Sequence, residues 1–394
     1  MTTRRRQTTA ALAAVLIAAT AGCQAQQAPP AGAPATHAAQ SGLPAAPAPS
    51  APPGFTLVAS GDVLPHTSVI ERANFDAGGH GYDFRPMFAA VMPVVSGADL
   101  AICHMEAVYG ADGHYTGYPT LKSPPQVAVA LAATGYDACS TASNHSLDDG
   151  AAGIRRTLDA FDQVGVRHAG SARTADEANS VTMMRAGDAK VAHFAYTYDT
   201  NGLPLPMGQP WAVNLIDPVR IIADARAARK AGADVVVVSL HWGTEWQDAP
   251  NEQQLRLSKE LTASVTNGRP DIDLILGTHA HVPQPYEKVN GTWVIYGMGD
   301  QVAGEMYNYQ GVQDPRGNEG TIGRFTFAPP AHRGGRWEVT KAEFIPQAYD
   351  LDAGRVVNLN AALDQGAGVG GVRDRIRDVV LSRGAAQDGL VMGQ

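Results

Sequence analysis

Short apolar segments alternate with longer amphipathic segments along most of the chain, beginning near Phe55. The short segments are rich in β-branched residues and are bounded by polar or turn-forming residues, which predicts buried strands. They cover residues 55–60, 99–102, 136–141, 191–196, 233–240, 271–276 and 292–296. The longer segments predict helices at residues 84–95, 125–133, 149–164, 218–231 and 252–265. Alternation of this kind is typical of a layered α/β fold.

The pattern changes after residue 320. Residues 321–327 and 337–344 predict two strands joined by a loop rich in Pro, Gly and Arg. We expect these strands to form a second sheet that closes the domain. Residues 373–381 predict a terminal helix.

The first residues resemble an export signal. Residues 4–6 are all arginine, and the apolar stretch at 9–21 is too short to cross a bilayer. Small residues at 20–22 precede Cys23, as at a bacterial lipoprotein cleavage site, although the threonine at position 20 replaces a larger aliphatic residue. An ordinary secretory signal cut near Ala25 is the alternative. Both interpretations predict export.

Residues 24–53 are dominated by Ala, Pro, Gln and Ser, and such a composition cannot bury a core. We expect a disordered linker here. The chain then divides into a lipoprotein-type signal (1–23), this linker, one α/β domain (54–350) and a C-terminal helical tail (351–394). The predicted location is outside the cell, anchored to the cell membrane through a lipidated Cys23, or secreted if Cys23 is not lipidated.

The charge balance limits the classes of molecule that this protein is expected to bind. The whole chain has a formal net charge of −8, and removal of the signal's three arginines leaves 27 basic against 38 acidic residues, a net charge of −11. An acidic surface argues against nucleic acid and against electrostatic docking on anionic lipid. A polyanionic substrate would need local positive charge, which bound metal ions supply.

Cys103 and Cys139 both lie near the ends of predicted strands. Buried free thiols are the usual state of such residues. A disulfide is the alternative if the two strands are neighbours, and the sequence leaves this open.

Polar residues follow nearly every predicted strand, at the sheet edge where α/β folds bind ligands. His279 and His281 lie one residue apart after the strand at 271–276, so their imidazoles can converge on one point. A pair of solvated loop histidines would be the simpler interpretation if they stood alone. Other strand ends add further possible ligands: Asp62, Glu106, Asn144, His145 and His241.

This mixed set of carboxylate, amide and imidazole groups suits Mn, Fe or Zn better than calcium or a thiolate zinc site. It is too large for one catalytic ion that keeps a water molecule. It matches two ions about 3.5–4 Å apart that share a carboxylate.

Five short motifs occur in the order seen in one protein family. They are residues 61–64, 105–106, 143–148, 241–245 and 277–281. With these motifs the chain resembles the CapA proteins of poly-γ-glutamate capsule biosynthesis (PGA_cap), over about residues 55–304. That resemblance implies the calcineurin-like metallophosphatase fold, a layered α/β/β/α sandwich.

The resemblance also implies a role for each site residue. The implied ligands of two divalent ions are Asp62, Glu106, Asn144, His241, His279 and His281. Glu106 would bridge the ions, and His145 would be the general acid or the group that stabilises the transition state. Three acidic residues, Asp148, Glu245 and Asp300, would orient ligands or face substrate, and ordinary loop or capping roles remain open for them.

Some positions depart from the family pattern. His104 and Met105 stand where asparagine and leucine are usual, and Asp300 replaces an asparagine. Many metallophosphatases have a histidine two residues after the first aspartate, where this chain has Leu64. His66 could replace that ligand only through a tight loop, and a solvated histidine is the alternative. The ion at Asp62 is therefore expected to be the weaker one.

Two functions follow. In the first, a dinuclear site activates water to hydrolyse a phosphoester or an amide of poly-γ-glutamate. In the second, a non-catalytic surface protein uses a structural metal site to bind or guide an exported capsule polymer. The expected partners are poly-γ-glutamate, another anionic polymer or a phosphoester, with no nucleic acid.

Overall fold

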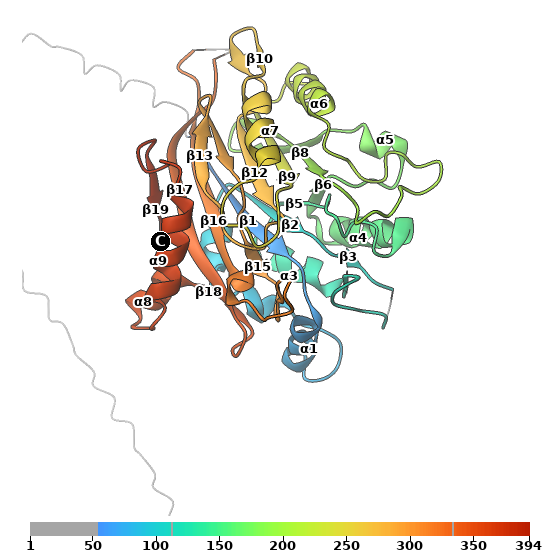
Figure 1. Ribbon diagram of the computed structural model, residues 1–394. Coiled ribbons are helices and arrows are strands. Elements are labelled where there is room, and N and C mark those ends of the chain that lie inside the picture. Colours follow the sequence, from blue (N-terminus) through green and yellow to red (C-terminus); the bar gives the residue numbers. More distant parts are fainter. Residues whose placement is uncertain (1–53, 112, 333–334) are drawn as a thin grey trace, which may run out of the picture. The chain divides into compact units, whose positions relative to one another are not determined.

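The computed structural model of the chain describes residues 54–111, 113–332 and 335–394 (Figure 1). The predicted signal, the linker and Cys23 lie outside the described residues. Two β-sheets pack against each other, and helices cover their outer faces. The predicted α/β class with two sheets is confirmed.

The first sheet is built around β1 (Phe55–Val63). Three strands extend it in parallel on one side: β2 (Leu100–Met105), β5 (Ala138–Ser140) and β6 (Arg167–Ala169). Three antiparallel strands extend it on the other side: β16 (Glu319–Ala328), β17 (Glu338–Asp350) and β18 (Arg355–Asn358). The short β15 (Asp300–Val302) pairs with the end of β1, and β19 (Leu390–Met392) pairs with β17.

The expectation that residues 321–327 and 337–344 begin a separate sheet is wrong. The first of these segments lies in β16, which pairs with β1 from Phe55↔Phe327 to Ser60↔Ile322. The apolar alternation of a strand states which face is buried, but it does not state which neighbour the edge will pair with.

The second sheet has the order β13-β14-β12-β9-β8-β7. Its four central strands are parallel: β14 (Thr292–Ile295), β12 (Leu274–Thr278), β9 (Val235–His241) and β8 (Ala189–Thr197). The edge strands are antiparallel: β13 (Tyr286–Val289) and β7 (Thr182–Ala186). Every residue of β9 is buried, as expected for a parallel strand covered on both faces.

Three buried clusters define the layers. Leu57 of β1 and Val237 of β9 belong to the core between the sheets. The neighbouring residue Val58 packs instead with the helices over the first sheet, and Val236 packs with the helices over the second. Adjacent residues of one strand thus serve opposite faces, so the sheets form the two inner layers of an α/β/β/α sandwich.

Five segments cover the outer face of the first sheet: α1 (Thr67–Asp76), η1 (Arg85–Phe88), α2 (Met92–Ser96), α3 (Gln126–Thr134) and α4 (Gly150–Val164). The single helix predicted at 84–95 is divided into η1 and α2, and each has a proline as its second residue, Pro86 and Pro93. A proline favours the first turn of a helix and cannot continue the preceding one, because it has no N–H.

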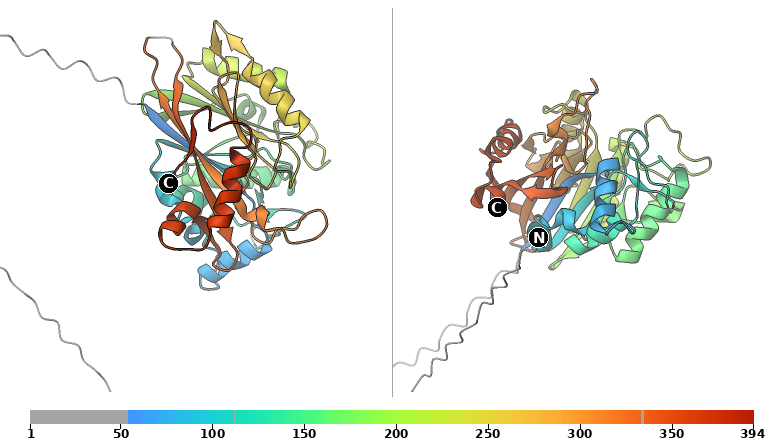
Figure 2. Two further views of the ribbon diagram at one scale, coloured as in Figure 1. Left: turned by 60° about the vertical axis from the view of Figure 1, so that its left-hand side comes forward. Right: turned by 90° about the horizontal axis from the view of Figure 1, so that it is seen from below.

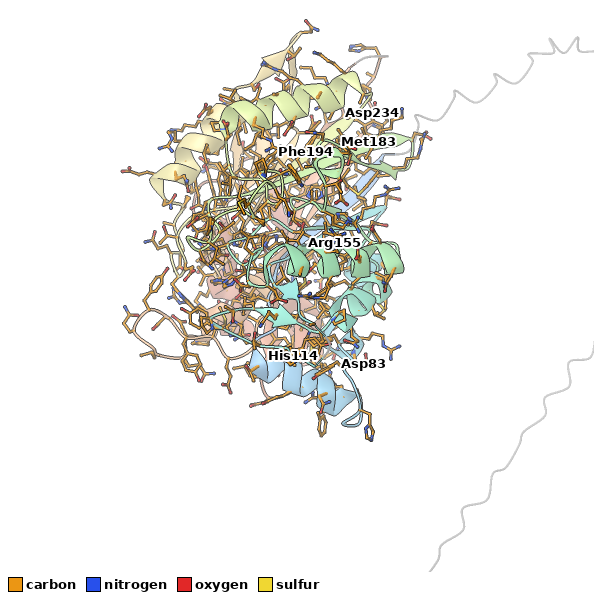
Figure 3. All side chains as sticks on the ribbon, turned by 90° about the vertical axis from the view of Figure 1, so that its right-hand side faces the viewer. Asp83, His114, Arg155, Met183, Phe194 and Asp234 are labelled. Carbon is orange, nitrogen blue, oxygen red and sulfur yellow. A yellow bond between two sulfur atoms is a disulfide. The ribbon has the colours of Figure 1, made fainter. Side chains whose placement is uncertain are left out.

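Two helices cover the second sheet: α6 (Pro218–Lys230) and α7 (Glu252–Thr262). A short helix, α5 (Ala175–Ala178), lies in the connection between β6 and β7. Helix α4 buries Leu158 and Phe161, while Arg155 lies on its exposed face (Figure 3). None of the helices in the described part of the chain is long and apolar enough to cross a membrane.

The C-terminal segment is part of the domain rather than a purely helical tail. It contains the predicted helix, α9 (Gly370–Val380), preceded by α8 (Leu359–Asp364). The remaining parts, β18 and β19, pair with β17. Ile376 and Val380 of α9 join the core between the sheets, and this burial keeps the segment on the domain. Helix α9 and α4 lie on opposite sides of the molecule (Figure 2).

Cys103 and Cys139 form a disulfide. They stand opposite each other in the register of β2 and β5, with their Cα atoms 4.4 Å apart. The expectation of two buried free thiols is therefore wrong, and the disulfide, given as the alternative, is what the structure has. The next residues on the two strands, His104 and Ser140, are also paired, and their side chains hydrogen-bond at 2.7 Å.

Candidate metal centre

The carboxyl ends of the parallel strands of both sheets meet at one place. Asp62 lies near the end of β1, Glu106 follows β2, and His241 ends β9. The other predicted ligands lie in loops after β5 and β12: Asn144, His279 and His281. All six are buried. The structure thus brings every predicted ligand to one cluster, drawn from segments far apart in the sequence.

Three groups of side chains in this cluster have ligand atoms within 4.8 Å of one another. They are Asp62 with His104 and His241, Glu106 with His279 and His281, and Asp62 with His281 and Asp300. Each group is compact enough to hold one ion, and the groups share Asp62 and His281, which is consistent with a dinuclear site. Asp62 is shared by two of the groups, whereas the resemblance implied that Glu106 is the bridge.

The cluster contains buried nitrogen and oxygen atoms that have no hydrogen-bond partner among the described residues. They are Asp62 Oδ1, His104 Nε2, both carboxylate oxygens of Glu106, His279 Nδ1 and Asp300 Oδ2. Buried polar atoms are nearly always paired, because an unpaired one costs about 1–3 kcal/mol and a charged one more. Divalent cations would satisfy all six at once. The donor set therefore fits a metal centre.

Burial shifts the pKa values of these groups toward their neutral forms. It raises the pKa of Asp62 well above its usual range, and the nearby Asp300 adds to this; it also raises the pKa of Glu106. Burial lowers the pKa values of His241 and His279 well below the usual range. A bound cation stabilises the ionised carboxylates and so offsets the free-energy cost of burying their charge. Neutral imidazole is the form of histidine that binds metal.

Asp300 stands directly opposite Asp62 in the pairing of β15 with β1. Its Oδ1 lies 3.1 Å from Nδ1 of His281. Burial alone would lower the pKa of His281, but Asp300 and Glu106 outweigh it and raise that pKa well above the usual value. A carboxylate that accepts the Nδ1–H of a histidine leaves Nε2 free to bind a metal. The geometry therefore allows Asp300 the orienting role that the resemblance implied.

A glycine makes room for this arrangement. A Cβ atom on Gly61 would lie 1.8 Å from the carbonyl oxygen of Gly299, so only glycine lets the chain before β15 approach β1.

The backbone of the two neighbouring histidine ligands is strained. His279 and His281 have φ angles of 93° and 57°, in the left-handed region. Each such residue costs on the order of 1–3 kcal/mol, a strain that is typical of functional sites. The backbone N–H of His279 donates to Asp62 Oδ2 at 3.0 Å.

His104 was not among the predicted ligands, yet it lies in the cluster. Its ring stacks on that of His241, with centroids 4.8 Å apart, and Nδ1 is hydrogen-bonded to Ser140. Burial lowers its pKa to about 3. The sequence did contain a signal for this position: His104 precedes Glu106 by two residues, and alternate residues of a strand face the same side.

His145 lies at the edge of the cluster. Its Nδ1 is 2.6 Å from Asp148 Oδ2, and its Nε2 is 4.0 Å from Glu106 Oε1. Asp148 also accepts the backbone N–H of Leu121. Asp148 thus fixes the ring of His145, and Nε2 is turned toward the cluster.

Asn144 Oδ1 is hydrogen-bonded to Nε2 of His241 at 2.8 Å, the contact that a shared ion would replace.

A cleft of about 560 Å³ opens beside the cluster, and His145 and His281 are among its lining residues. Two other predicted site residues, His66 and Glu245, line this cleft. His66 is in none of the three ligand groups. Burial, followed by His281 and His145, lowers its pKa to about 4. The structure therefore places His66 on the substrate side, and the idea that it replaces the missing ligand has no geometric support.

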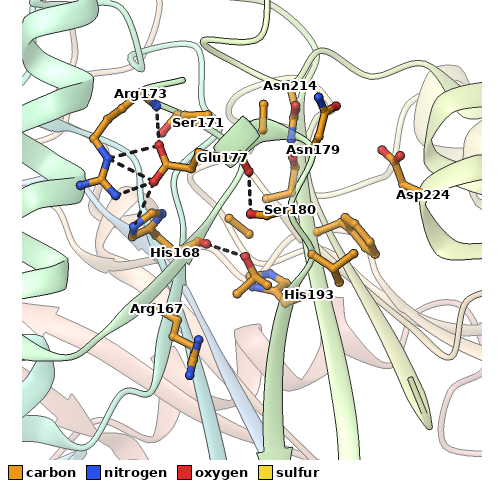
Figure 4. A pocket seen from close by; sticks show the side chains of 18 of the residues that line it. Arg167, His168, Ser171, Arg173, Glu177, Asn179, Ser180, His193, Asn214 and Asp224 are labelled. Atoms are coloured by element: carbon orange, nitrogen blue, oxygen red, sulfur yellow. Dashed lines mark hydrogen bonds and ion pairs between the residues drawn. The ribbon is translucent and has the colours of Figure 1, made fainter. Parts of the chain in front are cut away.

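A second cavity, of about 320 Å³, shares no lining residue with this cleft (Figure 4). Arg173 is its main cation, and it is bound to Glu177, Asp159 and Asp162. Because neighbouring carboxylates already neutralise this arginine, we treat the network as structural.

Comparison with known proteins identifies the family. The sequence model of the family described as bacterial capsule synthesis protein PGA_cap matches residues 56–305, the segment that contains every predicted ligand. The chain belongs to this family. The family expected from the sequence is thereby confirmed, and the buried clusters are consistent with a dinuclear metal site.

The PGA_cap chain is similar to several curated relatives. It is 25% identical to the capsule biosynthesis protein CapA of Bacillus anthracis over 46% of this chain and 44% of that protein. It is 26% identical to a probable polyglutamine synthesis accessory protein of Mycobacterium tuberculosis, over 54% and 57%. For the PGA biosynthesis protein CapA of Bacillus subtilis the identity is 27%, over 42% of each chain. The chain spans about half the length of the curated relatives it matches.

Solved structures also match at low identity. The NAD nucleotidase of Haemophilus influenzae is 14% identical with a TM-score of 0.41, and the match covers 86% of this chain and 57% of that one. The calcineurin-like phosphoesterase YfkN of Bacillus subtilis is 14% identical with a TM-score of 0.42, over 82% and 100%.

Proposed function

We propose that this PGA_cap protein is a metal-dependent hydrolase that cuts a phosphoester or an amide during capsule biosynthesis. The observation that carries the proposal is the set of buried, unpartnered ligand atoms, in a cluster that an open cleft reaches through His145 and His281. A structural metal site is closed by its protein ligands, whereas a catalytic one keeps access for water and substrate. His145 and His281 belong to the cluster and also line the cleft.

The residues that would hold two divalent ions of the Mn, Fe or Zn class are the predicted ligands together with His104. When bound, such ions supply a water nucleophile at neutral pH and Lewis acidity toward the substrate oxygen. The protein orients the ligands through further hydrogen bonds. Thr278 Oγ1 lies 3.0 Å from Nδ1 of His241, and Asp300 holds Nδ1 of His281.

His145 is the group placed to move a proton. Asp148 binds its Nδ1, so Nε2 faces the cluster at the edge of the cleft. In that position it can donate to the leaving oxygen or nitrogen as the bond breaks, or hydrogen-bond to the charge that develops. The same arrangement serves phosphoester and amide hydrolysis.

The test uses the mature chain stripped of metal and reloaded with Mn²⁺, Fe²⁺ or Zn²⁺. We expect reloading to restore hydrolysis of an aryl phosphate or of poly-γ-glutamate, and Asp62→Asn to abolish it. His168→Gln, a histidine of the second cavity, is the matched control and should keep the activity. Bound metal without activity on either substrate would favour the alternative, a non-catalytic protein that binds or guides capsule polymer.

We also propose that the protein works outside the cell, held to the membrane through a lipid on Cys23. The basic start at residues 4–6, the short apolar stretch and the small residues before Cys23 support this. Cys23→Ser should release the protein into the medium or leave its signal uncleaved. Unchanged membrane fractionation of that variant would reject lipidation.

A further inference from the structure

The cleft beside the metal centre has aromatic walls. Beyond His145 and His281, its lining includes four aromatic side chains from three segments of the chain: Tyr118, Trp246, and the pair Tyr307 and Tyr309. A substrate whose reacting group lies at the metal centre must place the rest of its structure in this cleft. The chemistry of these walls therefore selects the substrate.

Three of the four rings are open to solvent. Tyr118 is 76% exposed, Tyr307 55% and Tyr309 69%. Among the described residues, the exposed aromatic side chains are Phe75, Tyr118, Tyr198, Tyr307 and Tyr309. Phe75 does not line the cleft, and the guanidinium of Arg72 lies 5.2 Å from its ring centroid; the ring of Tyr198 lies 4.5 Å from that of His279 in the metal centre. Exposed aromatic surface on this protein is thus concentrated around the site, which is typical of a binding surface.

One of the aromatic walls, Trp246, is held in place before any ligand binds. Trp246 has a φ angle of 65°, and its backbone N–H donates to the carbonyl of Ala280 at 2.8 Å. Its ring fills the space beside Gly317, where a Cβ atom would lie 2.8 Å from it. Burial and the neighbouring Glu245 raise the pKa of the Tyr309 hydroxyl to about 12. Fixed rings lose little entropy when a ligand stacks on them.

The charges of the cleft disfavour a polyanion. No lysine or arginine is among its lining residues, while Glu245 and Glu305 both line it. A chain with a carboxylate on every unit would meet two like charges and no side-chain cation beyond the metal centre. The glutamates can instead accept hydrogen bonds from hydroxyl or amino groups of a neutral ligand.

We propose that the cleft binds a neutral ring, the sugar or base of a substrate whose single anionic group reacts at the metal centre. The ring stacks on the faces of Tyr309 and Trp246, and Glu245 or Glu305 accepts hydrogen bonds from its polar groups. This deepens the proposed function and rests on it, because hydrolysis itself requires the metal centre.

The first experiment compares phosphoesters that differ only in what the phosphate carries. The Mn²⁺-loaded full chain is given glycerol 3-phosphate, ribose 5-phosphate and adenosine 5′-monophosphate, with poly-γ-glutamate as a fourth substrate. We expect kcat/KM to be at least tenfold higher for a ring-bearing ester than for glycerol phosphate. The sugar phosphate and the nucleotide separate the two sources of a ring. Equal values for all three esters, or faster cleavage of poly-γ-glutamate, would overturn the proposal.

The second experiment locates the preference. Tyr309→Ala should lower the ratio of kcat/KM for the ring-bearing ester to kcat/KM for glycerol phosphate at least tenfold, and Tyr309→Phe should retain that ratio because the ring face remains. Phe75→Ala, an exposed ring elsewhere, should change nothing. If Tyr309→Ala leaves the ring preference intact, the stacking role is wrong.

The third experiment is independent of catalysis. Equilibrium dialysis of the full chain with free adenosine or ribose should show binding that Tyr309→Ala weakens at least tenfold. Ring binding without any hydrolysis would refute the proposed hydrolase and keep this inference. Hydrolysis without ring binding or ring preference would refute this inference and keep the proposed hydrolase.

Discussion

Nε2 of His104 lies 3.5 Å from Oδ1 of Asp62, and both atoms are buried without a hydrogen-bond partner among the described residues. On the other side of its ring, His104 is fixed by Ser140 through Nδ1. An imidazole held at one nitrogen with the other facing an unpaired carboxylate is the arrangement of a metal ligand with its orienting group. The expectation that the ion at Asp62 has fewer protein ligands must therefore be revised.

We expect His104→Asn, the residue usual in the family that the sequence resembles, to weaken one of two metal sites at least tenfold. Titration calorimetry with Mn²⁺ and the visible spectrum of the Co²⁺ form would measure this. His168→Asn is the control and should bind like wild type. An unchanged affinity and spectrum in His104→Asn would show that His104 only packs against His241.

His145→Ala should keep both metals and lower the hydrolytic rate by about 10²–10⁴, the usual effect of losing a general acid. Asp148→Asn should act in the same direction but less strongly, because the ring of His145 remains and only its orientation is released. Metal content and steady-state rates are measured together. Loss of a metal from His145→Ala would make His145 a ligand.

The network in the second cavity predicts a dependence of stability on pH. Burial opposes ionisation of Glu177, but the hydrogen bonds from Arg173 outweigh it and hold the pKa of Glu177 below its usual value; the same holds for Asp162. A lowered folded-state pKa gives stability that is present above the unfolded pKa and is lost as the pH falls through the folded pKa.

Arg173→Met should therefore lower the free energy of unfolding by about 1–2 kcal/mol at pH 7 and by less near pH 3, because these pairs are only partly buried. Urea unfolding at the two pH values measures this. Arg155→Met, on the exposed face of α4, should have almost no effect at either pH. A loss from Arg173→Met that is equal at both would point to packing rather than charge.

The disulfide closes a loop with a sequence separation of 36 residues. In the chain-entropy account, a bridge of this span stabilises the folded state by about 3–4 kcal/mol. The double variant Cys103→Ala, Cys139→Ala should lose about this much free energy of unfolding. A reductant should lower the stability of the wild type and leave the variant unchanged. If the wild type and the double variant had the same free energy of unfolding without reductant, this account would be contradicted.

The sequence by itself predicted the central strands of both sheets, the α/β class and the candidate ligands at strand ends. The valine-rich run of β9 has the length and β-branched content of a buried strand, and polar residues follow it. That Asp62 and His281 would meet came from the resemblance to the CapA family, because β1 and β12 belong to different sheets. The strands and their ends depend on local pattern, which can be read along the chain.

Only the tertiary structure decided which distant segments became neighbours. It placed β16 beside β1, joined Cys103 to Cys139, brought His104 against Asp62, and set Tyr118 and Tyr309 on one cleft. A strand's alternation gives its buried face but not its partner, and an exposed tyrosine carries no periodic signal at all. These contacts depend on the packing of whole layers, so residues separated by long stretches of chain acquire their roles only when the two sheets close on each other.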